Sequence, residues 1–170
     1  MTLLDILTYP DKRLRNKAAP VEFVDDDIQN IIADMAETMY NAPGMGLAAV
    51  QVGIDKRIII FDIYGPESEP TLEVLINPVI VESEGTQLSE SEGCLSVPDF
   101  RSDVKRFARV KVDALDRNGQ PVHIETDGLY AIVLQHEIDH LDGVLFIDKI
   151  SALKREMYKR KVKKQMKNKR

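Results

Sequence analysis

The stretch DGLYAIVLQHEIDHLDG, residues 127–143, decides the fold, because a helix with this sequence carries two histidines and a glutamate toward the core. His136 and His140 are four residues apart and therefore face the same way on a helix. Glu137 lies between them, close enough to act on whatever the imidazoles hold. The pattern is typical of a catalytic metal site, although two ordinary core histidines with a surface glutamate are the alternative.

Flanking residues predict a helix over this stretch. Asp127 can cap its first turn, and Gly143 follows its last turn. Leu129, Ile132 and Val133 continue the apolar spacing that leads to the histidines. Each imidazole on this face needs partners for both ring nitrogens, because an unpaired buried polar group is costly. A metal would satisfy one nitrogen of each ring.

Length and composition indicate a single globular domain. The 170 residues are 44% hydrophobic and 30% charged, as in ordinary soluble proteins. No apolar run approaches a membrane span, and the first residues lack a signal-peptide pattern, so we expect a cytoplasmic protein without a membrane partner. The single cysteine, Cys94, cannot form an intrachain disulfide and is a spare hydrophobe, a nucleophile or a ligand.

Charge is unevenly distributed. From Lys149 to Arg170 there are 11 basic residues and one acid, a charge of +10, whereas the remainder has 12 basic and 27 acidic residues, or −15. We therefore divide the chain into a catalytic domain, residues 1–150, and a basic helical tail, residues 151–170. A solvated helix face usually explains such a run, and docking on RNA or anionic lipid is the alternative.

The other expected elements do not alternate regularly. A helix is expected from Asp25 to about Pro43, and Ser151 can cap a final helix with a narrow apolar stripe at Leu153, Met157, Val162 and Met166. Expected strands cover residues 57–63, 72–83 with an edge position or bulge at Pro78, 108–115 and 121–126 as a hairpin, and 144–147. This order predicts an α+β fold, with mixed and antiparallel sheets packed around the central HEIDH helix and a C-terminal helix.

GMGLAAVQVG, residues 44–53, is the second unusual stretch. Its spelling resembles a dinucleotide fingerprint, but the expected helix precedes the loop and the strand follows it, which is the reverse of that motif. A simple turn into the strand is one interpretation. The other is that Gly44 and Gly46 allow another backbone to approach closely, with the amide of Gln51 nearby.

A catalytic zinc-type site usually has three protein ligands, so a third must join the two histidines. Phe146 stands where a long HExxH protease motif has a third histidine, and Glu156 lies among lysines. His123 alternates with apolar residues on the expected hairpin, so it should point away from the core. Cys94 remains, on a glycine-flanked stretch, and a thiolate with two imidazoles suits a divalent transition metal.

Three stretches, GMGLAAVQ (44–51), EGCLS (92–96) and HEIDH (136–140), together resemble the signature motifs of the peptide deformylase family. The resemblance covers nearly the whole chain apart from the tail after about residue 150, and the lack of long insertions resembles the short bacterial form. It implies a metal-dependent hydrolase that removes the formyl group from the starting methionine of new polypeptides and releases formate.

The resemblance also implies roles for individual residues. Cys94, His136 and His140 would hold one metal, typically Fe(II), although zinc, nickel or cobalt can occupy such sites. Glu137 would take a proton from the attacking water and deliver it to the leaving amine. Gln51 and the backbone N–H of Leu95 would stabilise the oxyanion. The nascent formyl-Met polypeptide would pair with the backbone near Gly46. Its methionine side chain would enter an apolar pocket, for which Leu129, Ile132 and Val133 are suitable lining, with ordinary packing as the alternative.

Charged residues are also expected near the site, and two other functions compete with the hydrolase. Arg101 and Arg106 are expected to steady Glu92 or the substrate end, with a surface ion pair as the alternative. Glu90 is more polar than we expect on its side of the pocket. Lys149 to Arg170 would dock on the ribosome. The alternatives are a metal-dependent endopeptidase and a non-catalytic RNA or ribosome binder, and the intact catalytic motifs argue against the binder.

Overall fold

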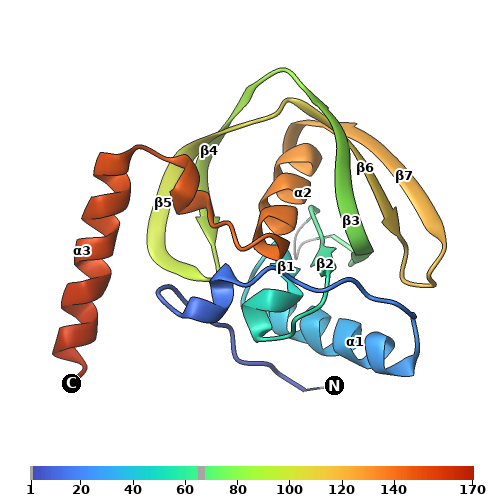
Figure 1. Cartoon of the computed structure of the whole chain (residues 1–170), viewed down its shortest axis with the longest axis horizontal. Coiled ribbons are helices and arrows are strands. Elements are labelled where there is room, and N and C mark those ends of the chain that lie inside the picture. Colours follow the sequence, from blue (N-terminus) through green and yellow to red (C-terminus); the bar gives the residue numbers. More distant parts are fainter. Residues whose placement is uncertain (1, 65–67) are drawn as a thin grey trace.

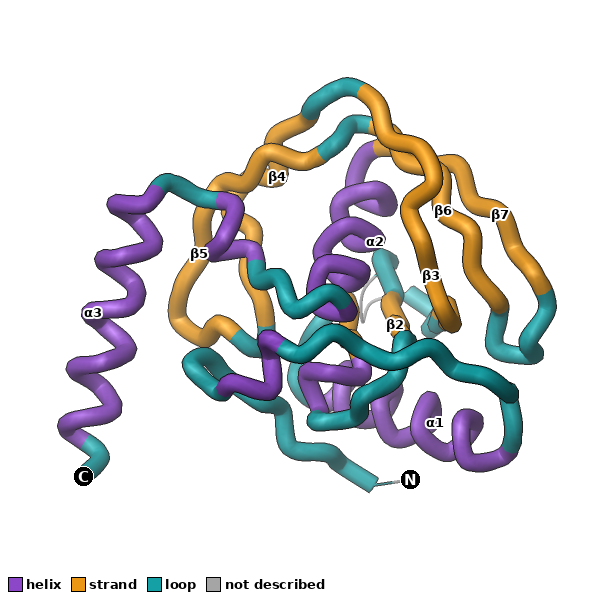
Figure 2. Tube along the Cα trace, in the orientation of Figure 1, coloured by secondary structure: helices purple, strands orange, loops and turns teal. Residues whose placement is uncertain are grey.

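The computed structural model describes residues 2–64 and 68–170. Its helices are α1 (Asp26–Asn41), α2 (Gly128–Leu141) and α3 (Ala152–Asn168), with 3₁₀ turns at Lys12–Arg15, Ala49–Val52 and Phe146–Lys149. Its strands are β1 (Gly46–Ala48), β2 (Ile58–Phe61), β3 (Glu73–Glu84), β4 (Gln87–Cys94), β5 (Val97–Arg106), β6 (Arg109–Leu115) and β7 (Pro121–Asp127). Figure 2 distinguishes the helices, strands and loops along the chain.

The strands form two sheets with α2 between them (Figure 1). A five-stranded sheet has the order β1-β2-β3-β6-β7, and β4 pairs with β5 in a two-stranded sheet. Every strand pair in the described residues is antiparallel. The prediction of an α+β fold around the HEIDH helix, with a C-terminal helix, is therefore confirmed.

Three buried apolar clusters hold the layers together. The first joins α2 to the five-stranded sheet through residues such as Leu134 and Ile138. The second packs α1 against β1 and β2, and the third joins the β4–β5 sheet to the Phe146–Lys149 turn and to α3. The central helix also contacts strands of both sheets, which fixes the direction of its side chains. Among the described residues, no helix combines the length and the hydropathy required to cross a bilayer.

α1 begins at an aspartate cap and has further acidic residues in its first turn. The side chain of Asp25 accepts a hydrogen bond from Ile28 N at 3.0 Å and caps the helix. Asp26 and Asp27 in the first turn place negative charge at the positive end of the helix dipole. The helix ends before Pro43, which cannot continue it.

Pro78 lies at a bulge in β3, which was one of the two predicted explanations for a proline in this strand. The register between β3 and β6 shifts between Ile76 and Val79, and Asn77 has a φ of 52°. Val21 N donates to the Asn77 side chain and Val21 O accepts from it, both at 2.8 Å. The edge alternative is wrong, because β3 lies inside the sheet between β2 and β6.

Residues 144–147 do not form the predicted strand. Leu145 N donates to the Asp148 side chain and Asp148 N donates to Leu145 O, each at 2.9 Å, and these bonds curl the chain into a 3₁₀ turn. Phe146 and Ile147 are buried in the third cluster. A short buried apolar run has no periodicity that distinguishes a strand from a turn, which explains the error.

The apolar face of α3 also differs from the prediction. Ser151 caps the helix through a 3.3 Å bond from Lys154 N, as expected. However, three members of the predicted stripe are exposed, Leu153 at 72%, Met157 at 62% and Met166 at 46%, and the buried residues are Tyr158 and Val162. The helix packs through the aromatic ring of Tyr158, which lies 4.7 Å from Phe100 between ring centroids.

The start of α2 lacks one predicted feature. Asp127 occupies the N-cap position, but its side chain makes no capping hydrogen bond. Gly128 then adopts a φ of +58°, a conformation that glycine reaches without steric cost. The turn into α2 therefore depends on the glycine and not on the aspartate side chain.

Gly143, after α2, supplies a test of this packing. A Cβ at Gly143 would overlap the carbonyl group of Arg15, with Arg15 C 2.8 Å away, and its φ of +74° is left-handed. Left-handed strain alone costs about 1–2 kcal/mol. We expect Gly143→Ala to lower the free energy of unfolding by more than this, because a backbone carbonyl cannot easily move aside.

Gly128→Ala is the matched control for denaturant unfolding. Its φ is also left-handed, at +58°, but a Cβ there meets nothing within 4 Å. The free energy of unfolding of Gly128→Ala should therefore fall only by the cost of the left-handed strain. Equal losses in the two variants would contradict the close approach of residue 143 to Arg15.

Candidate metal centre and cavity

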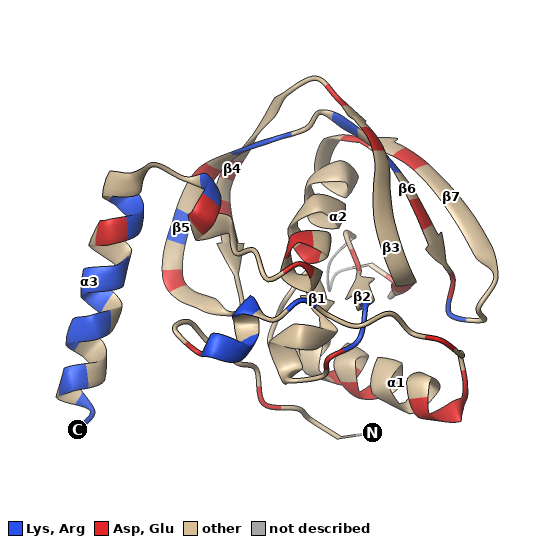
Figure 3. Cartoon of the chain, in the orientation of Figure 1, with Lys and Arg blue, Asp and Glu red and all other residues tan. Residues whose placement is uncertain are grey.

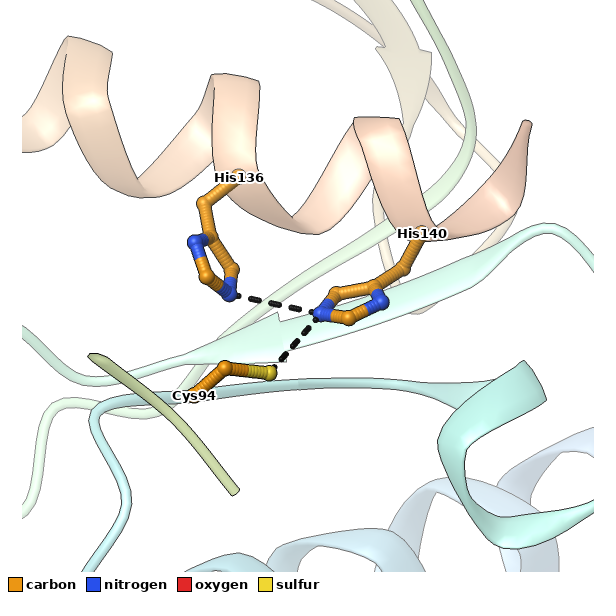
Figure 4. Close-up of side chains that lie close together, drawn as sticks. All are labelled: Cys94, His136 and His140. Carbon is orange, nitrogen blue, oxygen red and sulfur yellow. Dashed lines mark hydrogen bonds between the residues drawn. The ribbon is translucent and has the colours of Figure 1, made fainter. Parts of the chain in front are cut away.

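Three potential metal ligands converge between α2 and the end of β4 (Figure 4). Cys94 Sγ and His140 Nε2 are 3.3 Å apart, and His140 Nε2 is also 3.3 Å from His136 Nε2. All three ligand atoms lie within 4.8 Å of one another. The helix places both imidazoles on one face because the residues are one turn apart.

The carboxylate of Glu92 sets the direction of the His136 ring. Glu92 Oε1 lies 2.6 Å from His136 Nδ1, which leaves Nε2 turned toward the other two ligands. Such a partner on the second ring nitrogen is typical of metal-ligating histidines. Burial favours the neutral form of Glu92, but its bonds from His136 and Arg106 outweigh burial and lower its pKa to about 2.

Arg106 ties this carboxylate to the central helix. Its guanidinium is buried, pairs with Glu92 and lies 2.7 Å from Asp139 Oδ2. The expectation that Arg106 steadies Glu92 agrees with this contact, and the pair is buried instead of lying on the surface. Arg101 instead donates to Ser91 O at 3.1 Å and lies at the exposed rim.

Gln51 is held with its amide beside the sulfur. Its Oε1 accepts from Ala48 N at 2.9 Å, and its Nε2 donates to Ser96 Oγ at 3.0 Å. The same Nε2 lies 3.6 Å from Cys94 Sγ. Because one bond fixes each end of the amide, an N–H must face the ligand cluster.

Glu137 is buried beside the ligands. Its Oε2 has no hydrogen-bond partner within residues 2–64 and 68–170. Burial, the largest influence, raises the pKa of Glu137 to about 7, although the nearby positive charge of His136 opposes the rise. A carboxyl group with such a pKa can both accept and donate a proton near neutral pH.

A cavity of about 860 Å³ opens above this cluster. Its wall includes the residues that the sequence suggested for substrate binding, namely Gly46, Leu129, Ile132 and Val133, together with Leu95 and Gln51. Val133 is buried, whereas Leu129 is 48% exposed and lies nearer the solvent. Glu90 and Arg101 also line the cavity, so its rim carries both signs of charge.

His123 is remote from this arrangement, as the hairpin pattern predicted. Its side chain is 78% exposed and pairs with Asp113 at 2.7 Å. Two contributors to the site were missed. Ser96 and Asp139 bond residues around the ligands, and Asp139 already stands inside the HEIDH motif, where its i+3 spacing from His136 was a signal.

The donor set fits a transition metal. Burial lowers the pKa of His140 well below its usual value, and the charge of His136 lowers it further, so this ring is neutral and has a free lone pair. One sulfur and two imidazole nitrogens gathered within 4.8 Å of one another are a set that iron, cobalt, nickel and zinc accept. The cavity leaves one side of the cluster open.

Comparison with known proteins agrees with this geometry. Residues 3–156 match the family model described as polypeptide deformylase. The chain is 53% identical over 167 residues to a peptide deformylase of Desulfosudis oleivorans, covering 98% of this chain and 96% of the relative. A crystal structure of a peptide deformylase from Legionella pneumophila superposes with a TM-score of 0.89 at 48% identity, covering 99% and 98% of the two chains.

A second solved relative, from Ehrlichia chaffeensis in complex with actinonin, gives a TM-score of 0.88 at 43% identity, over 97% of this chain and 98% of that chain. Sequence and fold thus agree with these relatives over nearly the full length. The chain belongs to the polypeptide deformylase family and is a metal-dependent hydrolase that removes the N-formyl group from newly synthesised polypeptides.

Proposed function

We propose that Cys94, His136 and His140 hold one divalent cation and that Glu137 transfers the protons of the reaction. The observation that carries this assignment is the convergence of the three ligand atoms within 4.8 Å, next to a buried carboxyl group at the wall of the cavity. When bound, the cation supplies a Lewis acid that activates water and polarises the formyl carbonyl. The protein residues position the substrate, stabilise the developing negative charge and transfer protons.

Glu137 acts first as a base and then as an acid. Its carboxylate takes a proton from the water that attacks the formyl carbon, and the protonated group then gives this proton to the leaving amine. A pKa of about 7 suits both steps, because neither protonation state is strongly disfavoured at neutral pH. The C–N bond breaks as the amine is protonated, and formate and a free amino terminus result.

Negative charge that develops on the formyl oxygen requires donors already in place. We assign this role to the Gln51 amide and the backbone N–H of Leu95. The bonds from Gln51 to Ala48 N and Ser96 Oγ hold the amide in one orientation, which supports the assignment. Fixed donors are effective because they need no reorganisation during the reaction.

The polypeptide enters as an extended strand beside β1. Gly46 has no side chain to obstruct the approach of another backbone, and it lies at the wall of the cavity. The methionine side chain then packs against the apolar part of the wall formed by Leu129, Ile132 and Val133. Glu90 and Arg101 lie farther along the wall, where later residues of the polypeptide pass.

We expect Glu137→Gln to lower kcat for formate release from a formyl-Met peptide by about 10²- to 10⁴-fold, because the amide cannot accept the proton. Glu125→Gln, an exposed substitution of the same kind on β7, should leave the rate unchanged. Metal content, measured on both variants, should match that of the wild type.

Product analysis separates the competing activities. Formate without internal cleavage supports the proposed roles, whereas new internal fragments indicate an endopeptidase. A Glu137→Gln variant as fast as the wild type would remove Glu137 from the mechanism. Inertness of the metal-loaded wild type would favour a binding protein.

We propose that the native cation is Fe(II). The mixed set of one sulfur and two nitrogens accepts iron as well as zinc, nickel and cobalt, and the resemblance to the family favours iron. Cys94 beside a redox-active metal is open to oxidation, which would remove one ligand. Activity in air should therefore decay faster for the iron-loaded protein than for the zinc- or nickel-loaded protein, and equal half-lives would refute this.

We also propose that the basic tail docks on ribosomal RNA, in the cytoplasm where nascent chains emerge. Lys and Arg residues occur along the whole length of α3 (Figure 3). Tyr158 and Val162 anchor the helix in the third apolar cluster, so the helix presents its charges from a fixed position. Deleting the tail would expose this cluster, and charge removal is therefore the cleaner experiment.

Replacing Lys154, Lys163 and Lys164 with Gln should weaken ribosome binding and flatten its salt dependence, because fewer phosphate contacts release fewer counterions. All three side chains are exposed. The matched control replaces exposed lysines elsewhere, at Lys12, Lys17 and Lys105. Cosedimentation with ribosomes at several salt concentrations measures both variants, and identical behaviour would make α3 a solvated helix only.

A further inference from the structure

Gly46 occupies a position where glycine needs an explanation. It is part of strand β1 and pairs with Phe61 of β2, and glycine within a strand weakens the sheet. Its φ lies outside the left-handed range. The backbone conformation therefore gives no reason for glycine, and the reason must lie in what a side chain would touch.

The face of β1 that carries Gly46 is the face toward α2. Successive strand residues point to opposite sides. Leu47 packs in the cluster under α1, whereas Ala48 packs in the cluster that contains Leu134 and Ile138 of α2. Gly46 and Ala48 share a face, so β1 turns its two smallest residues toward the central helix and can approach it closely.

The group that occupies the space at Gly46 is the carboxylate of Glu137. A Cβ built at Gly46 would lie 2.5 Å from Glu137 Oε1, 2.9 Å from its Cδ and 3.1 Å from its Cγ. The other oxygen, Oε2, has no hydrogen-bond partner within the described residues. The backbone at Gly46 therefore limits where this carboxylate can stand.

We propose that Gly46 is a positioning residue for Glu137: its missing side chain sets where the carboxylate stands relative to the ligand cluster. This role is additional to the admission of the substrate backbone, and it depends on the proposed role of Glu137 in proton transfer. A methyl group at residue 46 would push the carboxylate away from its site. A displacement of about 1 Å in a reacting group can cost about 10²-fold in rate.

Thermal unfolding of the full-length, metal-loaded protein tests the contact without using the reaction. Gly46→Ala should lower the Tm of the wild type, because the new methyl group collides with Glu137. In a Glu137→Ala background the space is free, so the same substitution should lower the Tm much less. Such dependence of one substitution on another is the mark of direct contact.

Gly44→Ala is the matched control, two residues away. A Cβ at Gly44 would lie 2.6 Å from Leu95 Cδ1 and not near Glu137. Its effect on Tm should be the same in both backgrounds. If Gly46→Ala behaved like this control, with equal losses in both backgrounds, the proposed contact would be overturned.

Kinetics then test the consequence for catalysis. Gly46→Ala should lower kcat about 10²-fold with metal content unchanged, in addition to any rise in KM from hindered substrate admission. A raised KM with unchanged kcat would assign Gly46 to substrate admission alone and overturn the positioning role. Formate release by the wild type is a separate measurement, so failure of the proposed function and failure of this inference give different results.

Discussion

One geometric constraint governs this structure: the sulfur of Cys94 must meet two ring nitrogens of α2 at a single point. Cys94 and His140 are 46 residues apart in the chain, and no local interaction can bring them together. The two-stranded sheet ends at Cys94 and the central helix carries both histidines, so the packing of these two elements creates the site. The third apolar cluster joins this sheet to the Phe146–Lys149 turn, and the ring of Phe146 stacks on that of His136 with centroids 6.2 Å apart.

The buried charged groups around the site pair with one another, which offsets the cost of burying them. Burial of Glu92 or Arg106 alone would leave an uncompensated charge, which is strongly destabilising. Together with Asp139 they form a linked set in which Glu92 also bonds His136. The same set therefore satisfies buried charges and orients the His136 ring, a proposed metal ligand. Glu137 differs, because one of its oxygens has no partner among the described residues and its pKa is shifted toward neutrality.

Sequence patterns predicted the parts of the fold that depend on local chemistry. The α1 helix, the hairpin of β6 and β7 and the α2 helix all have short-range signals, and all three elements are present. The β4–β5 hairpin was not predicted, because its strands contain bulges that break the alternation of apolar and polar residues. The buried face of α3 was also missed, since the contact of Tyr158 with Phe100 is set by tertiary packing.

The candidate site was predicted more completely than the fold around it. His136 and His140 are related by helical spacing, and Cys94 follows from elimination and from the family resemblance, so their meeting could be expected. By contrast, Ser96 as a partner of Gln51 and the contact between Gly46 and Glu137 are visible only in three dimensions. A sequence shows which residue types are present, whereas approach distances depend on how the elements pack.

X-ray absorption spectroscopy of the metal-loaded protein measures the central claim most directly, because it reports which atoms surround the cation. The account predicts one sulfur at about 2.3 Å and two imidazole nitrogens at about 2.0–2.1 Å if zinc is bound, and loss of the sulfur signal in Cys94→Ser. A first shell without sulfur in the wild type would contradict it.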